Sequence, residues 1–216
     1  MVNKEIKEYI ENEILPKYAA LAGHTGEHIE EVILRSLEFA KQAPEAKVDM
    51  VYVIAAYHDL GRLVDNETHN IESAKMLLAD KFLSSRFSPE EMKVMAEAVE
   101  DHRASLGREP RSVYGRIVSS ADRNPNFESM LGRCFDYNRM LYPENSVLET
   151  VEEERQIIRR KYSPDGYAAK TMYFRDPSFE KMLVEVEEKT RTSERFLEVM
   201  KEYFKKVGRG ELEECE

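Results

Sequence analysis

The sequence has few of the features that mark secreted, membrane-spanning or nucleic-acid-binding proteins. It contains two cysteines, Cys134 and Cys215, in 216 residues, too few for a disulfide framework, so we expect a reduced, cytoplasmic setting. No apolar run approaches the ~20 residues that cross a bilayer, and the charged N-terminal stretch lacks the apolar segment of a secretion signal. Basic residues number 32 against 42 acidic ones, a net charge of -10. This balance argues against nucleic acid polymers and anionic membranes as partners.

Glycine and proline are also sparse, with 9 and 8 residues, and apolar residues recur at helical spacing almost throughout the chain. Ser88 and Ser146 each begin a capping box, the signature of a helix N-terminus. We therefore predict an all-α fold. The helices are expected at about 4–21, 25–40, 48–59, from 69, 89–102, 112–123, 127–140, 147–162 and 177–207, the last as one helix or a pair.

The stretch 48–56 is apolar on nearly every side apart from Asp49, so it is expected to be buried. Its β-branched cluster at 51–54 is compatible with a strand, but its length and Asp49 as an N-cap favour a helix. This helix ends in His58 and Asp59. Burying a carboxylate costs several kcal/mol unless a cation or several donors meet it.

All five histidines fall within the first 102 residues, and four of them lie at a predicted helix end: His28, His58, His69 and His102. Asp59 and Asp122 lie at helix ends as well. Any single histidine is more often structural than a ligand. Together, however, imidazoles and carboxylates from several facing helices are what Mn, Fe, Co, Ni or Zn accept in a bundle core.

The order of His28, His58-Asp59 and Asp122 resembles the HD-domain metal-dependent phosphohydrolases. The local sequences also look alike: EHIEEV at 27–32, HDLGR at 58–62 and SADR at 120–123. His69 and His102 match the two further histidines of the two-metal members. The GYP motif of one such group is missing, so cyclic-dinucleotide hydrolysis is not supported.

The resemblance implies that His28, His58, Asp59 and Asp122 hold one divalent metal. His69 and His102, with Asp59 bridging, can hold a second, and Mg is an alternative to the transition metals. Asp59 and His58 are then catalytic, and a metal-activated water attacks phosphorus. The resemblance covers about half of the chain. From the chain length we expect a single helical domain over 1–216, with the metal-site core at 22–125 and a C-terminal helical extension at 126–216 covering the pocket.

Three arginines stand next to ligand positions and are candidates for binding substrate phosphate: Arg62, Arg103 and Arg123. The alternative for the arginines of this region is pairing at the surface with Glu100, Asp101 or Glu109. His24 has two equal interpretations, a catalytic proton donor to the leaving oxygen or a loop histidine without a role.

These observations predict a hydrolase that acts on a small phosphorylated metabolite, a nucleotide or another phosphomonoester. The alternatives are a phosphodiesterase or pyrophosphohydrolase with the same site, a non-catalytic metal- or nucleotide-binding regulatory module, and a di-iron oxygenase. A purely structural bundle is the least favoured, because it leaves Asp59 and Asp122 without cationic partners. The sequence does not determine the oligomeric state.

Overall fold

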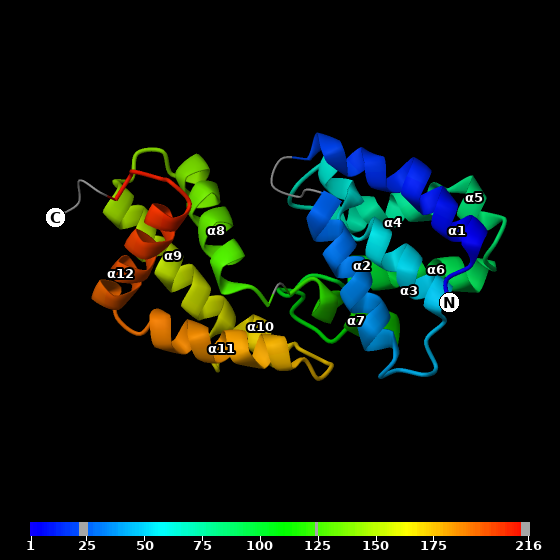
Figure 1. Cartoon of the computed structure of the whole chain (residues 1–216). Helices are drawn as coiled ribbons and strands as arrows, with labels where there is room; N and C mark the ends of the chain where they lie inside the picture. The colour runs from blue at the N-terminus through cyan, green and yellow to red at the C-terminus, as the bar shows by residue number, and fades with distance from the viewer. Residues whose placement is uncertain (22–25, 124, 213–216) are drawn as a thin grey trace. The chain divides into compact units, whose positions relative to one another are not determined.

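The computed structural model describes residues 1–21, 26–123 and 125–212, and these ranges contain helices and no strand (Figure 1). The all-α prediction is therefore confirmed. The chain divides into two compact units. The N-terminal unit comprises Met1–Arg123 together with Thr171–Phe174, and the C-terminal unit comprises the remainder. Within the described ranges, no helix is long and apolar enough to cross a membrane. Coverage of the pocket by the C-terminal helices stays a prediction.

The first helical stretch changes its winding twice. Helix α1 (Lys4–Tyr9) continues as a π-helix, η1 (Ile10–Ile14), and then as a 3-10 helix, η2 (Leu15–Ala20). Pro16 lies in the first turn of η2, where its missing N–H is tolerated. Apolar residues four apart keep one face of this stretch in the core: Ile6, Ile10 and Ile14.

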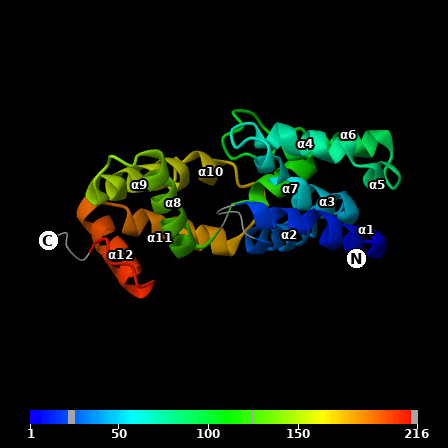
Figure 2. The ribbon, with the colours of Figure 1, turned by 90° about the horizontal axis from the view of Figure 1, so that it is seen from above.

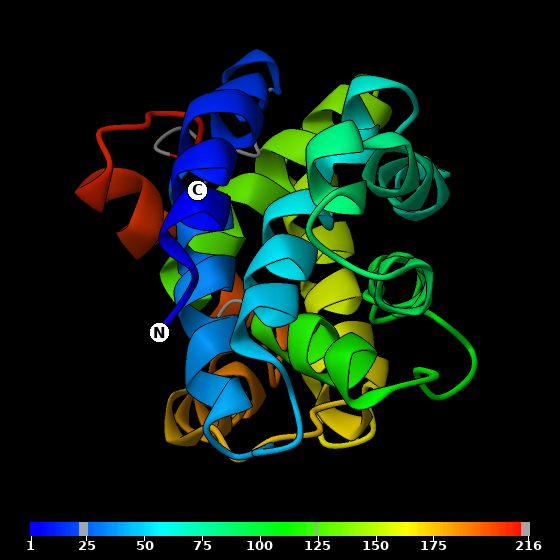
Figure 3. The same cartoon turned by 90° about the vertical axis from the view of Figure 1, so that its right-hand side faces the viewer.

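Helix α3 lies at the centre of the N-terminal unit and packs against α2, α6 and α7. Figure 3 looks onto this unit, with α2 in blue and α3 in cyan side by side. Helix α4 packs on α6 and on the short 3-10 turn η3, as Figure 2 shows for the two helices. The bounds are α2 (Gly26–Ala40), α3 (Val48–Tyr57), η3 (Leu60–Leu63), α4 (His69–Ala79), α5 (Lys81–Ser84), α6 (Pro89–Glu100) and α7 (Val113–Ala121).

The β-branched cluster at 51–54 is helical and fully inside the core, because α3 is covered on every side from Met50 to Tyr57. The prediction that Asp49 caps this helix is wrong. The N-cap is Lys47, which makes no side-chain capping bond. Asp49 lies in the first turn, where its carboxylate accepts the backbone N–H of Asn3 at 2.7 Å.

Helix α6 begins at the predicted capping box of Ser88 and Glu91. Its apolar stripe is buried as expected, and the stripe leads to His102, two residues beyond the helix end. Helix α7 begins after Ser112, whose hydroxyl accepts the N–H of Gly115, and ends with Asp122 as its C-cap. Both helices therefore deliver a predicted ligand at their C-terminal ends.

The C-terminal unit is a separate helical core. Aromatic residues form much of it, with the rings of Phe135 and Phe204 packed edge to face at a centroid distance of 4.8 Å. The second capping box, Ser146 with Glu149, is formed as predicted. The bounds are α8 (Phe127–Leu141), α9 (Val147–Tyr162), α10 (Tyr167–Lys170), α11 (Pro177–Lys189) and α12 (Ser193–Lys206).

The segment Thr171–Phe174 lies between α10 and α11 in the sequence but belongs to the N-terminal unit. The Tyr173 N–H donates to the Ser120 hydroxyl at 3.1 Å. The Phe174 ring stacks on Phe39 of α2 at 5.5 Å between centroids. This segment therefore completes the unit beside the C-terminal end of α7.

Candidate metal centre

The C-terminal end of α3 places an imidazole and a carboxylate in the interior. His58 is 0% and Asp59 is 1% exposed. The helix ends at Tyr57, and Asp59 leaves helical geometry with φ -109° and ψ 3°. The end of α3 is fixed by the buried Tyr18 hydroxyl, which donates to the Ala56 carbonyl at 2.8 Å. The pair is therefore held where neither side chain can turn to solvent.

Four other elements bring histidines and a second aspartate to this pair: α2, α4, the end of α6 and the end of α7. On one side, Asp122 Oδ1 lies 3.3 Å from His28 Nε2 and 3.7 Å from His58 Nε2. On the other, Asp59 Oδ1 lies 3.2 Å from His69 Nε2 and 3.5 Å from His102 Nε2. All six predicted ligands thus converge from five parts of the fold.

The cluster contains two groups of three side chains whose ligand atoms all lie within 4.8 Å of one another. One group is His28, His58 and Asp59, and the other is Asp59, His69 and His102. Asp59 is common to both groups. This is the arrangement in which a single carboxylate can bridge two cations.

Three of the imidazoles are oriented by the backbone in the same way. In each case Nδ1 lies at hydrogen-bond distance from the carbonyl three residues earlier: Ala55 for His58 at 2.8 Å, Asn66 for His69 at 2.8 Å and Val99 for His102 at 2.7 Å. Because a carbonyl only accepts, Nδ1 carries the proton and the lone pair of the neutral ring is on Nε2. Every Nε2 points into the cluster, as metal-ligating histidines require.

The donor set fits a divalent cation. His58 Nε2 is buried and has no hydrogen-bond partner among the described residues. His69 Nε2 and His102 Nε2 lie 3.2 Å apart, a distance at which two lone pairs require a proton or a cation between them. A borderline metal such as Mn, Fe, Co, Ni or Zn accepts this mixture of imidazole and carboxylate.

Burial lowers and the nearby carboxylates raise the pKa of His58 and of His69, but the balance differs between the two. Burial would lower the pKa of His58, but Asp59 and Asp122 outweigh it and raise the pKa to about 9. Burial also dominates at His69, where Asp59 compensates only in part and the pKa falls to about 4. Burial would raise the pKa of Asp122, yet His28 and His58 hold it well below its ordinary value. The Asp122 carboxylate is therefore anionic and ready to bind a cation.

The three arginines proposed for phosphate have different surroundings. Arg62 Nε lies 2.9 Å from Asp59 Oδ2, inside the cluster. Arg103 donates to the Glu67 carbonyl at 2.8 Å. Arg123 is buried, 3% exposed, and donates to the hydroxyls of Ser119, at 3.1 Å, and Thr171. A phosphate-binding role for each of them stays a prediction, and the contacts of Arg123 give it a role in packing.

The sequence predicted Asp101 only as a surface partner of nearby arginines and missed that it is buried. It is 0% exposed and directly precedes His102. Its carboxylate accepts from Arg108 at 2.6 Å and from Arg111 through both backbone and side chain. Surface pairing was the alternative considered for these arginines, and Arg116 with Glu109 fits it at 3.0 Å. The available signal was the three arginines that follow Asp101 within ten residues.

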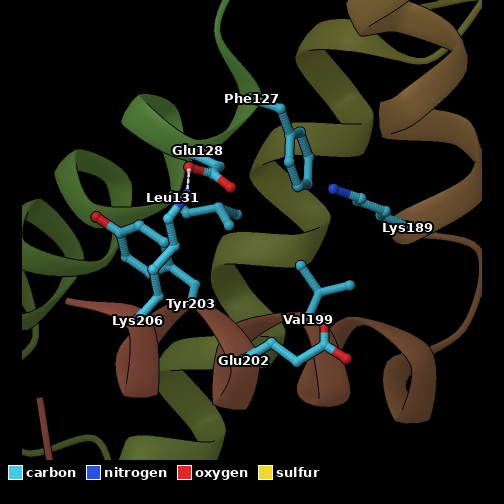
Figure 4. Close-up of a pocket in the computed structure, with 8 residues that line it drawn as sticks. All are labelled: Phe127, Glu128, Leu131, Lys189, Val199, Glu202, Tyr203 and Lys206. Carbon is cyan, nitrogen blue, oxygen red and sulfur yellow. Dashed lines mark hydrogen bonds and ion pairs between the residues drawn. The ribbon is translucent and has the colours of Figure 1, made fainter. Parts of the chain in front are cut away.

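His24 is outside the described residues, so its catalytic role stays a prediction. A small cavity of about 140 Å³ lies within the C-terminal unit, between α8, α11 and α12 (Figure 4). Its lining is Phe127, Glu128, Leu131, Lys189, Val199, Glu202, Tyr203 and Lys206.

The comparisons agree with the motif analysis. Residues 25–124 match the family model described as HD domain. The match spans the described ligands from His28 to Asp122 and confirms the family resemblance. No curated protein and no solved structure matched the chain.

Proposed function

Because residues 25–124 belong to the HD domain family, we propose that this protein is a metal-dependent phosphohydrolase that acts on a small phosphorylated metabolite. The family consists mostly of metal-dependent phosphohydrolases. The observation that carries the proposal is the position of Asp59, whose carboxylate is shared by two groups of inward-facing imidazoles. Nucleotides and other phosphomonoesters are the proposed substrate class.

In this proposal His28, His58, Asp59 and Asp122 hold one divalent ion, and Asp59 with His69 and His102 holds another. When bound, such ions lower the pKa of a water nucleophile and neutralise charge on the phosphoryl oxygens. The chain contributes rigid geometry, because three rings are fixed through Nδ1 to backbone carbonyls. It also keeps bulk water from the buried side of the cluster.

The phosphate of the substrate is proposed to meet Arg62 first, because this guanidinium already lies within the cluster and its side chain is 20% exposed. A planar guanidinium binds two phosphate oxygens at once. Arg103, next to His102, supplies a second cation near the same group. Protonation of the leaving oxygen is assigned to His24 as part of the same proposal.

Metal analysis of the purified chain, followed by a panel of phosphomonoesters, phosphodiesters and pyrophosphates with several divalent metals, tests this function. Asp59→Asn and His58→Ala should lower metal content and reduce turnover by about 100-fold or more, since they remove ligands. Asp165→Asn is the matched control, because this side chain is 97% exposed. Wild-type turnover in Asp59→Asn would overturn the site. Metal binding without hydrolysis of any substrate would favour the regulatory module.

A further inference from the structure

The Arg62 guanidinium lies between two of the proposed ligands of the second ion. Its Nε is 2.9 Å from Asp59 Oδ2, and its Nη2 is 3.5 Å from His69 Nε2. Its Nη1 donates to the Asn66 side-chain oxygen. The side chain therefore reaches into the cluster and is held there by Asn66, in the polar loop that precedes α4.

One contact is made to a ligand atom of the second group, His69 Nε2. The other is made to Asp59 Oδ2, the oxygen 3.8 Å from His58 Nε2, while Oδ1 of the same carboxylate faces His69 and His102. His69 Nδ1 is committed to the Asn66 carbonyl, so His69 Nε2 offers a lone pair to whatever lies in front of it. A guanidinium has only N–H donors and keeps its charge at every accessible pH. Arg62 thus presents a permanent cation to Asp59 and to the lone pair of His69.

We propose that Arg62 competes with the second metal ion for Asp59 and His69, and that a phosphate-bearing ligand relieves the competition by drawing the guanidinium away. This inference rests on the proposed metal site and adds a condition under which the second ion binds. Arg62 is suited to move from Asp59 to a phosphate because its side chain is partly exposed. The guanidinium can donate two parallel hydrogen bonds to a phosphate, whereas at Asp59 it faces a single carboxylate oxygen. By linkage, the phosphate ligand and the second ion then strengthen each other's binding.

The test is a Mn²⁺ titration of the full chain. Calorimetry and the electron paramagnetic resonance signal of free Mn²⁺ measure how many ions bind and with what affinity. Without phosphate, Arg62→Gln should tighten binding of the second ion about tenfold, the scale of one charge-assisted hydrogen bond. Arg103→Gln removes the same charge beside His102 but contacts Glu67 instead of Asp59. As the matched control it should change that affinity by no more than about twofold, the effect of a screened surface charge.

A second arm repeats the titration with inorganic phosphate. Phosphate should tighten the second ion in the wild type more than in Arg62→Gln, because the variant has no competitor to remove. Arg62→Lys should tighten the second ion too, since an ammonium cannot face Asp59 and His69 through two separate nitrogens.

Second-ion affinity in Arg62→Gln that is equal to or weaker than wild type would overturn the inference, since Arg62 would then support Asp59 as a ligand. An equal gain in Arg103→Gln would also overturn it, because net charge alone would explain the effect. A wild-type chain that binds no ion would instead refute the proposed metal site. The two failures are therefore distinguishable without measuring turnover.

Discussion

A methyl group added at Gly61 should disable one half of the metal centre and spare the other. Gly61 lies in η3, two residues after Asp59, and its N–H donates to the buried Ser73 hydroxyl of α4 at 2.7 Å. A Cβ at this position would lie 2.1 Å from the His69 carbonyl oxygen and 2.5 Å from the Ser73 nitrogen. Both atoms belong to the backbone of α4, so the clash cannot be relieved by a side-chain rotation.

The size of the effect follows from these distances. Ordinary contact begins at 3.4 Å, so η3 and α4 must separate by about 1.3 Å, whereas metal sites tolerate errors of about 0.2 Å. Overpacking of this kind costs about 1–3 kcal/mol, and weakening the Gly61–Ser73 bond costs about 1 kcal/mol more. A domain with a stability of about 5–15 kcal/mol can survive that loss. His69 moves away from Asp59, while His28 and Asp122 lie on other helices.

Mn²⁺ calorimetry combined with thermal unfolding checks this expectation. Gly61→Ala should retain the first ion, lose or strongly weaken the second, and melt at a lower temperature than wild type. Gly107→Ala is the control. The φ of +60° at this position strains an alanine, but nothing lies within 4 Å of the added atom, so this variant should bind both ions. Ser73→Ala, which removes the acceptor without adding bulk, should act more weakly in the same direction. Wild-type ion binding by Gly61→Ala would refute the reasoning.

Three other perturbations have defined outcomes. Burial, and to a lesser extent the charge of Asp136, raise the pKa of Glu154 in the folded chain well above 4.5. As the pH rises above about 4.5, the unfolded chain therefore releases this proton before the folded chain does, and the free energy of unfolding falls. Glu154→Gln should abolish this loss of stability, which amounts to about 1.4 kcal/mol per pH unit up to the pKa of the folded chain. Thermal melts of variant and wild type between pH 5 and 8 check this, and a difference in stability that does not change with pH would contradict it. Thr171→Val removes one acceptor of the buried Arg123 and should cost about 1–3 kcal/mol in denaturant unfolding; an unchanged midpoint would mean that water replaces the hydroxyl. Chelation of bound metal should lower the melting temperature, and Mn²⁺ at 100 times its dissociation constant should restore about 2.7 kcal/mol, whereas equal melts would contradict binding to the folded chain.

Most of the fold could be predicted because it depends on local signals. Capping boxes at Ser88 and Ser146 and helical spacing of apolar residues are properties of short segments, and the structure contains the corresponding helices. The Asp49 cap could not be predicted correctly, because its carboxylate binds the N–H of Asn3, a residue 46 positions away. Glu154 stands in an acidic run typical of a wet helix face, yet it is fully buried. Only the packing of other helices decides which face is covered.

The candidate site shows the same division. Histidines and aspartates at helix ends were sufficient to select six side chains that the fold brings together. Nearby acidic partners of the arginines were predicted, and Arg108 and Arg116 pair with two of them. The partners of Arg62 and Arg123 were not, since the pair Arg62–Asp59 depends on the turn at η3 and the pair Arg123–Thr171 on how distant parts of the chain fold together. The orientation of each imidazole was also out of reach, because it needs the carbonyl of the residue three positions earlier to point inward.

The return of Thr171–Phe174 to the N-terminal unit has a consequence for the timing of synthesis. Arg123 leaves the ribosome 48 residues before Thr171, which at about 5–20 residues per second is a delay of about 2–10 s. During that interval α8, α9 and α10 are translated, and Phe39 lacks its stacking partner Phe174. The unit that holds the histidine cluster is thus completed late in translation, and a nascent chain stalled before residue 171 would carry this cluster without the last segment that packs on the unit.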